Sequence, residues 1–221
     1  MCFSATASFT ASAILLVIAY FSVKKTTKIS ELFFAGIPFL FAIQQFSEGV
    51  LWLTFTDSDY DCLRALSGNT FMFIAQVIWP IWVPFSIYQI EKSALMKKGL
   101  LVFVGLGFIL SLCFFWYFIT YGVEPKLAEN HILYVHYYPK TYEILGTIFY
   151  ITVTVIPLFL STYRRMWILG FAILISYIVL KWAYVNYLIS VWCFFAAVSS
   201  CAVYYILLEI KGHEDVPINF I

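Results

Sequence analysis

Glu48 is the residue of this chain whose type and position most clearly suggest chemistry. It lies about two-thirds of the way along the apolar run 32–55, in the stretch Gln-Gln-Phe-Ser-Glu. A charged side chain inside a membrane-spanning helix is costly and rare, and it marks a binding site, a proton path or a buried ion pair. A carboxylate there could bind a proton or a cation, or it could serve as a general acid and base.

Several neighbours share a face with Glu48 if this run is helical, because residues three and four apart lie on one side of a helix. The shared stripe consists of Phe41, Gln45, Glu48 and Trp52, flanked by Gln44 and Ser47. In lipid each amide and carboxyl group needs a partner, so this face is expected to point into a bundle. Two interpretations stay open: a polar clasp between helices, or a pocket that binds a ligand.

Other chemically capable residues are expected at the same membrane depth as Glu48. They are Cys2, Ser4, His131, His136, Glu143 and Lys181. Cys2, expected beside Glu48, and Ser4 are candidate nucleophiles, whereas Lys181 is either a buried partner of Glu48 or a side chain that extends to the interface. The two histidines are candidate ligand-binding residues. They would need a third and usually a fourth ligand to hold a metal, so we predict no metal site and no cofactor, with zinc kept as an alternative.

The composition requires that most of the outer surface faces lipid. Hydrophobic residues make up 63% of the 221, aromatic residues 21% and charged residues 11%, with a mean hydropathy of +0.91. Soluble domains have about 45–50% apolar and about 25% charged residues. The net charge of +1 gives no indication of a nucleic-acid partner, and the five scattered cysteines lack the spacing of a zinc site or a disulfide scaffold.

Seven apolar segments are long enough to span a bilayer, which takes about 20 residues. They cover residues 3–23, 32–55, 68–90, 99–121, 143–161, 166–185 and 187–208. The predicted fold is therefore an all-α integral membrane protein, a single bundle of seven transmembrane helices over residues 1–210 with a short cytoplasmic tail at 211–221. One larger outer loop is expected at 121–142. The segment Trp79-Pro80-Ile81-Trp82-Val83-Pro84 predicts a kink with tryptophans at the membrane interface.

The basic residues predict how the bundle is oriented, since cytoplasmic loops carry an excess of lysine and arginine. With the amino terminus outside and the carboxyl terminus inside, nine of the thirteen basic residues are cytoplasmic. These nine are Lys24, Lys25, Lys28, Lys92, Lys97, Lys98, Arg164, Arg165 and Lys211. In this orientation Glu48 lies in the outer half of the membrane and Lys181 in its outer third.

Two motifs carry a resemblance to a known family. The opening Met-Cys-Phe-Ser-Ala-Thr-Ala-Ser-Phe and the later Gln-Gln-Phe-Ser-Glu-Gly-Val-Leu-Trp, together with the Trp79-Pro80 segment, resemble a family of uncharacterised bacterial multi-pass membrane proteins. The resemblance covers nearly the whole chain. It implies an integral membrane fold in the bacterial inner membrane, and it implies that Cys2, Ser4, Gln44, Gln45, Glu48 and Trp52 belong to motifs.

Two classes of function fit these residues. In the first, the protein binds, transports or senses a small ligand or ion in an outward-facing polar pocket, with Glu48 as a proton or cation site and Gln44 and Gln45 orienting the ligand. In the second, it is a membrane-embedded enzyme that acts on lipid, with Glu48 as acid and base. The expected partners are the lipid bilayer and a small molecule, ion or lipid, and nucleic acid is not among them.

Overall fold

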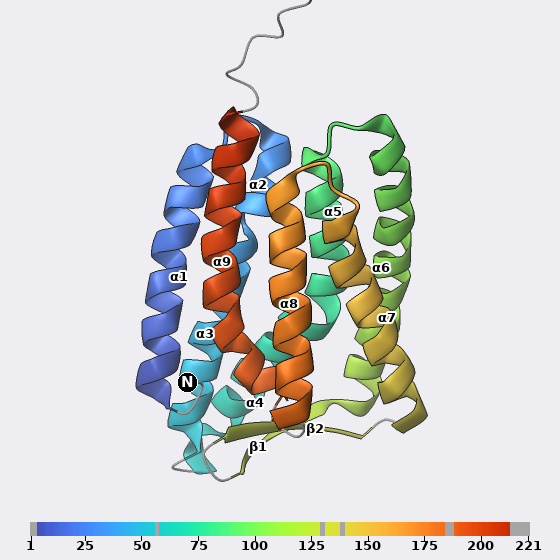
Figure 1. The fold of residues 1–221 in the computed structure, drawn as a ribbon. Coiled ribbons are helices and arrows are strands. Elements are labelled where there is room, and N and C mark those ends of the chain that lie inside the picture. Colours follow the sequence, from blue (N-terminus) through green and yellow to red (C-terminus); the bar gives the residue numbers. More distant parts are fainter. Residues whose placement is uncertain (1–3, 56–57, 129–130, 138–139, 184–187, 213–221) are drawn as a thin grey trace, which may run out of the picture.

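The computed structural model describes residues 4–55, 58–128, 131–137, 140–183 and 188–212. Within these residues the chain forms seven side-by-side helical rods, closed at one end by a β-hairpin (Figure 1). The helices are α1 (Ala5–Lys25), α2 (Ile29–Ala35), α3 (Ile37–Thr54), α4 (Asp61–Phe73), α5 (Trp79–Ile90), α6 (Ala94–Tyr121), α7 (Lys140–Phe159), α8 (Arg164–Ala183) and α9 (Leu188–Gly212). A short 3-10 helix, Ser58–Tyr60, precedes α4, and α2 runs into α3 as one rod.

The rods coincide with the seven predicted apolar segments to within a few residues at most ends. Five of them are long and apolar enough to cross a membrane: Ala5–Lys25, Ile29–Thr54, Asp61–Ile90, Ala94–Tyr121 and Arg164–Trp182. Helix α7 contributes a shorter apolar stretch, Ile144–Phe159. The mostly helical fold is thus confirmed, while the seven membrane crossings and the orientation stay predictions. Helix α9 continues two residues into the predicted tail, whose remainder lies outside the described residues.

The segment predicted as an outer loop contains a β-hairpin, so the all-α prediction is wrong there. Strands β1 (Val123–Ala128) and β2 (His131–His136) pair antiparallel. Successive strand residues point to opposite faces, and alternate residues of β2, Ile132 and Tyr134, are buried. The ring of Tyr134 stacks on that of Phe71, with centroids 4.9 Å apart. Apolar residues alternate along this segment, so a strand places them all on one face. That face covers the open end of the bundle, which stabilises the hairpin.

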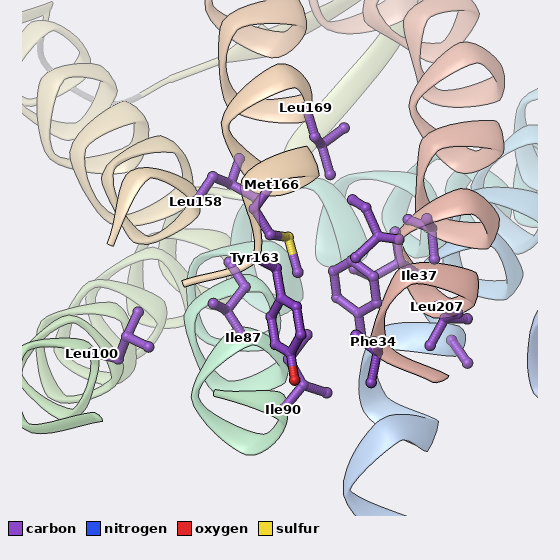
Figure 2. Close-up of a cluster of buried hydrophobic side chains, with 14 of the residues drawn as sticks. Phe34, Ile37, Ile87, Ile90, Leu100, Leu158, Tyr163, Met166, Leu169 and Leu207 are labelled. Carbon is purple, nitrogen blue, oxygen red and sulfur yellow. The ribbon is translucent and has the colours of Figure 1, made fainter. Parts of the chain in front are cut away.

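A large apolar core fills the opposite end of the bundle, where most of the basic residues cluster. Figure 2 shows its side chains converging from several helices, with the Tyr163 ring beside Ile90. Core members that are almost fully buried are Phe34, Ile87, Leu100, Leu158, Met166 and Ile206. Every rod except α1 contributes residues to this core, and the rods also carry apolar residues that are exposed, as expected for helices that pack in lipid.

A π-helix, η2 (Ile74–Ile78), joins α4 to α5. Pro80 has no N–H, so the wider turn leaves the Ala75 carbonyl without a donor from its own helix. The Tyr150 hydroxyl of α7 donates to that carbonyl oxygen at 2.8 Å. Within α5, Pro84 likewise withholds a donor from the Pro80 carbonyl. Helix α6 lies directly against this carbonyl at Gly107.

Candidate functional site

The predicted polar face of α3 points into the bundle, as expected. Glu48 has no exposed surface, Gln45 is 1% exposed, and Gln44 and Ser47 are also buried. Burial of these four residues confirms the prediction that this face points into the bundle. Glu48 lines neither of the two best-formed cavities among the described residues. It is therefore enclosed by protein rather than set in an open pocket.

Gln44 is a structural clasp between α3 and the α4–α5 rod. Its Oε1 accepts a hydrogen bond from Trp79 Nε1 at 2.8 Å, and its Nε2 donates to the Phe71 carbonyl at 3.3 Å. Both polar ends of the amide are thus used by the fold. Trp79 is buried, so the predicted interfacial position is wrong for this residue, because its indole N–H finds its acceptor inside the bundle.

Gln45 and Trp52 differ from Gln44, because the fold leaves polar atoms of both unpaired. Nε2 of Gln45 and Nε1 of Trp52 are buried and have no acceptor among the described residues. Helix α1 closes this side of α3, where the Phe9 ring packs on Gly49 and Ser12 Oγ donates to the Ala42 carbonyl at 2.9 Å. Two buried N–H donors on the face of α3 that carries Glu48 thus lack an acceptor among the described residues.

The remaining sequence candidates whose side chains are described are Lys181, Ser4 and His131. Lys181 is exposed and lies over the Tyr177 ring at 5.8 Å, and no ion pair joins it to Glu48 within the described part of the chain. Ser4 Oγ caps α1 by accepting from Ala7 N at 3.2 Å. His131 is half-buried at the start of β2 and pairs through its backbone with Ala128.

Three candidates lie wholly or partly outside the described residues. Cys2 precedes the first described residue, so its predicted position beside Glu48 lies outside the described residues. His136 ends β2 opposite Val123 and Glu143 lies in α7, but their side chains are not described. Among the described residues, no group of three or more histidine, cysteine, aspartate or glutamate side chains is placed to hold a metal.

Sequence analysis missed a second polar centre, at the end of the bundle opposite the hairpin. A cavity of about 110 Å³ lies there between the ends of α2, α5 and α9, and its walls include Glu31 and Glu91, which are 5% and 2% exposed. Both carboxylates lie among lysines at the ends of apolar runs. Their position, as acidic residues among the lysines of a basic end, was the sequence feature that could have predicted this centre.

Glu91 joins the α5–α6 turn to the α7–α8 turn. Its carboxylate accepts from Lys92 N and Ser93 N, both at 2.9 Å, and from Thr162 N and Oγ1 at 2.8 and 2.7 Å. Burial alone would raise the pKa of Glu91, but the hydrogen bonds from Ser93, Thr162 and Lys92 outweigh burial and lower it. The charged form is therefore the one that the fold stabilises.

This lowered pKa predicts a loss of stability in acid. A carboxyl group whose pKa is lower in the folded than in the unfolded state contributes stability above its unfolded pKa, about 4.3, and loses it as the pH falls through the folded value. Glu91→Gln is expected to lower the free energy of unfolding by about 1.5–3 kcal/mol at pH 7. The difference should shrink below about pH 4. Thermal unfolding in detergent from pH 7 to 3 checks this, with Glu209→Gln as control; a constant difference would contradict it.

The chain belongs to a family of unknown function, DUF6629, whose model matches residues 1–214. The family thus covers the helical bundle, both polar centres and the hairpin. Comparison with curated proteins and with solved structures gave no match.

Proposed function

We propose that this protein is a multi-pass protein of the bacterial inner membrane that binds a proton or a small cation at Glu48. It belongs on this proposal to the binding, transport or sensing class rather than to the lipid-acting enzymes. The seven rods are its transmembrane helices, with the amino terminus outside and the carboxyl terminus inside. Glu48 then lies in the outer half of the membrane, beneath the hairpin.

One observation carries the proposal: the contrast between Gln44 and its neighbour Gln45 on the buried face of α3 that carries Glu48. Both parts of the face are buried, but Gln44 has an acceptor and a donor in the fold, whereas Gln45 keeps an unpaired buried Nε2 among the described residues. A face that served only as a clasp would pair all its polar groups, because each unpaired one costs about 1–3 kcal/mol. The pairing of Gln44 supports a clasp on one side of α3. On the other side the unpaired N–H groups of Gln45 and Trp52 need an acceptor, which a water molecule bound to a cation at Glu48 would supply.

The orientation is supported by the distribution of charge over the two ends. The nine basic residues of the predicted cytoplasmic loops all belong to the end opposite the hairpin (Figure 1, top). At the hairpin end, Glu124 pairs with Lys126 at 3.1 Å and Arg64 with Asp61 at 2.6 Å, so positive charge there is offset by carboxylates.

Cation-dependent stability of the purified protein tests the proposed site. A ligand that binds only the folded state at about 100 times its Kd stabilises it by about 2.7 kcal/mol. Unfolding in detergent, followed by tryptophan fluorescence, is expected in the wild type to shift upward with Na⁺ or K⁺, or as the pH is lowered within the range above about pH 5 where Glu91 stays charged. Glu48→Gln keeps the shape of the side chain but removes its charge, so it should fold and lose this response.

Glu124→Gln is the matched control, because Glu124 is an exposed carboxylate at the same end of the bundle. It should respond to cations as the wild type does. A wild-type protein whose stability ignores both cations and pH, or a Glu48→Gln protein that keeps the response, would show that Glu48 serves the fold alone.

A further inference from the structure

The cavity at the basic end combines charges of both signs in a small volume. Its wall contains the carboxylates of Glu31 and Glu91, and its lining also includes Lys28 and Lys92. The acids are buried, whereas both lysines are exposed. Negative charge therefore lies in the interior of this cavity and positive charge at its mouth.

Glu31 has a carboxylate oxygen that the fold does not use. Its Oε2 accepts from Thr27 N at 2.8 Å, and Oε1 has no hydrogen-bond donor among the described residues. The side chain is 5% exposed and lines the cavity. Glu91, in contrast, has both oxygens occupied. A carboxylate oxygen that faces a cavity and accepts from no described protein donor can accept from a cationic group of a ligand.

The position of the cavity along the bundle identifies the layer of the membrane it would face. The rod Ile29–Thr54 has 26 residues. At ~1.5 Å per residue it is about 39 Å long, which exceeds the roughly 30 Å of hydrocarbon in a bilayer. The ends that line the cavity thus extend into the headgroup layer. Ile29, next in the chain to the lining residues Lys28 and Ser30, is an apolar residue with 80% of its surface exposed.

We infer that this cavity binds the headgroup of a phospholipid whose phosphate carries a primary amine, as in phosphatidylethanolamine. The ammonium group donates to Glu31 Oε1 inside the cavity, and the phosphate lies at the mouth between Lys28 and Lys92. The buried carboxylates thus face the positive ammonium group of the headgroup, and the exposed lysines face its negative phosphate. This inference rests on the membrane placement proposed above and is independent of the Glu48 centre.

Three lipids with the same acyl chains separate this chemistry from its alternatives. Phosphatidylcholine has the same phosphate, but its methylated ammonium has no N–H to donate to Glu31. Phosphatidylglycerol has the negative charge without an amine, so it reports attraction to the basic end alone. A charge-assisted hydrogen bond corresponds to about tenfold or more in affinity.

The experiment is native mass spectrometry of the purified, delipidated protein titrated with each lipid. Wild-type protein should bind phosphatidylethanolamine about tenfold more tightly than phosphatidylcholine or phosphatidylglycerol. Glu31→Gln should abolish that preference, and Lys92→Gln should weaken all three lipids alike. Glu209→Gln, at the same end but outside the cavity lining and paired with Arg165 at 3.7 Å, should bind as the wild type does.

Each opposite result would overturn the inference. Equal wild-type binding of phosphatidylethanolamine and phosphatidylcholine excludes the amine contact, and tighter binding of phosphatidylglycerol leaves a basic surface only. If soluble phosphoethanolamine competes for the cavity as well as phosphatidylethanolamine does, the ligand need not be a lipid, which would contradict the inference. Comparing the three lipids on the wild-type protein does not depend on whether any variant folds. Glu48→Gln should keep the lipid preference, so failure of the cation site and failure of this one are distinguishable.

Discussion

Gly107→Ala is expected to destabilise the bundle more than any other single methyl group added to α6. A Cβ at this position would lie 2.1 Å from the Pro80 carbonyl oxygen. The obstacle is backbone of α5, held in place by the π-helix and Pro84, so no side-chain rotation relieves it. Helices α5 and α6 would have to separate, and such overpacking costs about 3 kcal/mol or more.

Gly105→Ala is the matched control, because a Cβ there meets nothing within 4 Å. Both substitutions gain the same helix propensity, about 0.5–1 kcal/mol, so their difference isolates the contact with Pro80. Thermal unfolding and gel filtration in detergent should show Gly105→Ala at or above wild-type stability and Gly107→Ala well below it. Equal stability of the two variants would contradict the close approach of α5 and α6.

The second large effect is expected at the clasp formed by Gln44. Gln44→Leu would leave the Trp79 N–H and the Phe71 carbonyl without their side-chain partner in the interior. Leaving a buried donor unpaired costs about 1–3 kcal/mol. The total is expected to be about 3 kcal/mol in the free energy of unfolding.

A double-mutant cycle separates this pairing from loss of packing. Trp79→Phe removes the indole N–H, so in the double variant with Gln44→Leu no donor is left unpaired. The double variant should be more stable than the sum of the two single losses, with a coupling of about 1 kcal/mol or more. Strict additivity would show that the Gln44–Trp79 hydrogen bond does not contribute to stability.

The helical part of the fold could be predicted from sequence because hydropathy acts over 20-residue windows. The inward face of α3 followed for the same reason: Glu48 and Gln45 can avoid lipid on one side only. Rod ends such as Ile29 and Gly212 differed by a few residues, because capping and local packing determine where a helix begins and ends.

The features that sequence analysis missed depend on contacts between distant segments. The hairpin is stabilised by Ile132 and Tyr134 on a second core with Phe71, which a run of loop-like residues does not reveal. Two of the four hydrogen bonds of Glu91, those from Thr162, require two turns 71 residues apart to meet. Lys181 had two predicted positions; its side chain is exposed and lies over the Tyr177 ring, and its position at the membrane interface stays a prediction.

Labelling of single cysteines in intact cells tests most directly whether this bundle crosses the membrane as proposed. Cys62 is exposed near the hairpin, and Leu95 is 71% exposed at the basic end. Cys62 should react with a membrane-impermeant maleimide applied from outside, with Cys62→Ser as the blank. In the Cys62→Ser background, Leu95→Cys should react only after the cells are permeabilised. Protection of Cys62 together with outside labelling at position 95 would contradict the orientation and the placement of Glu48 in the outer half of the membrane.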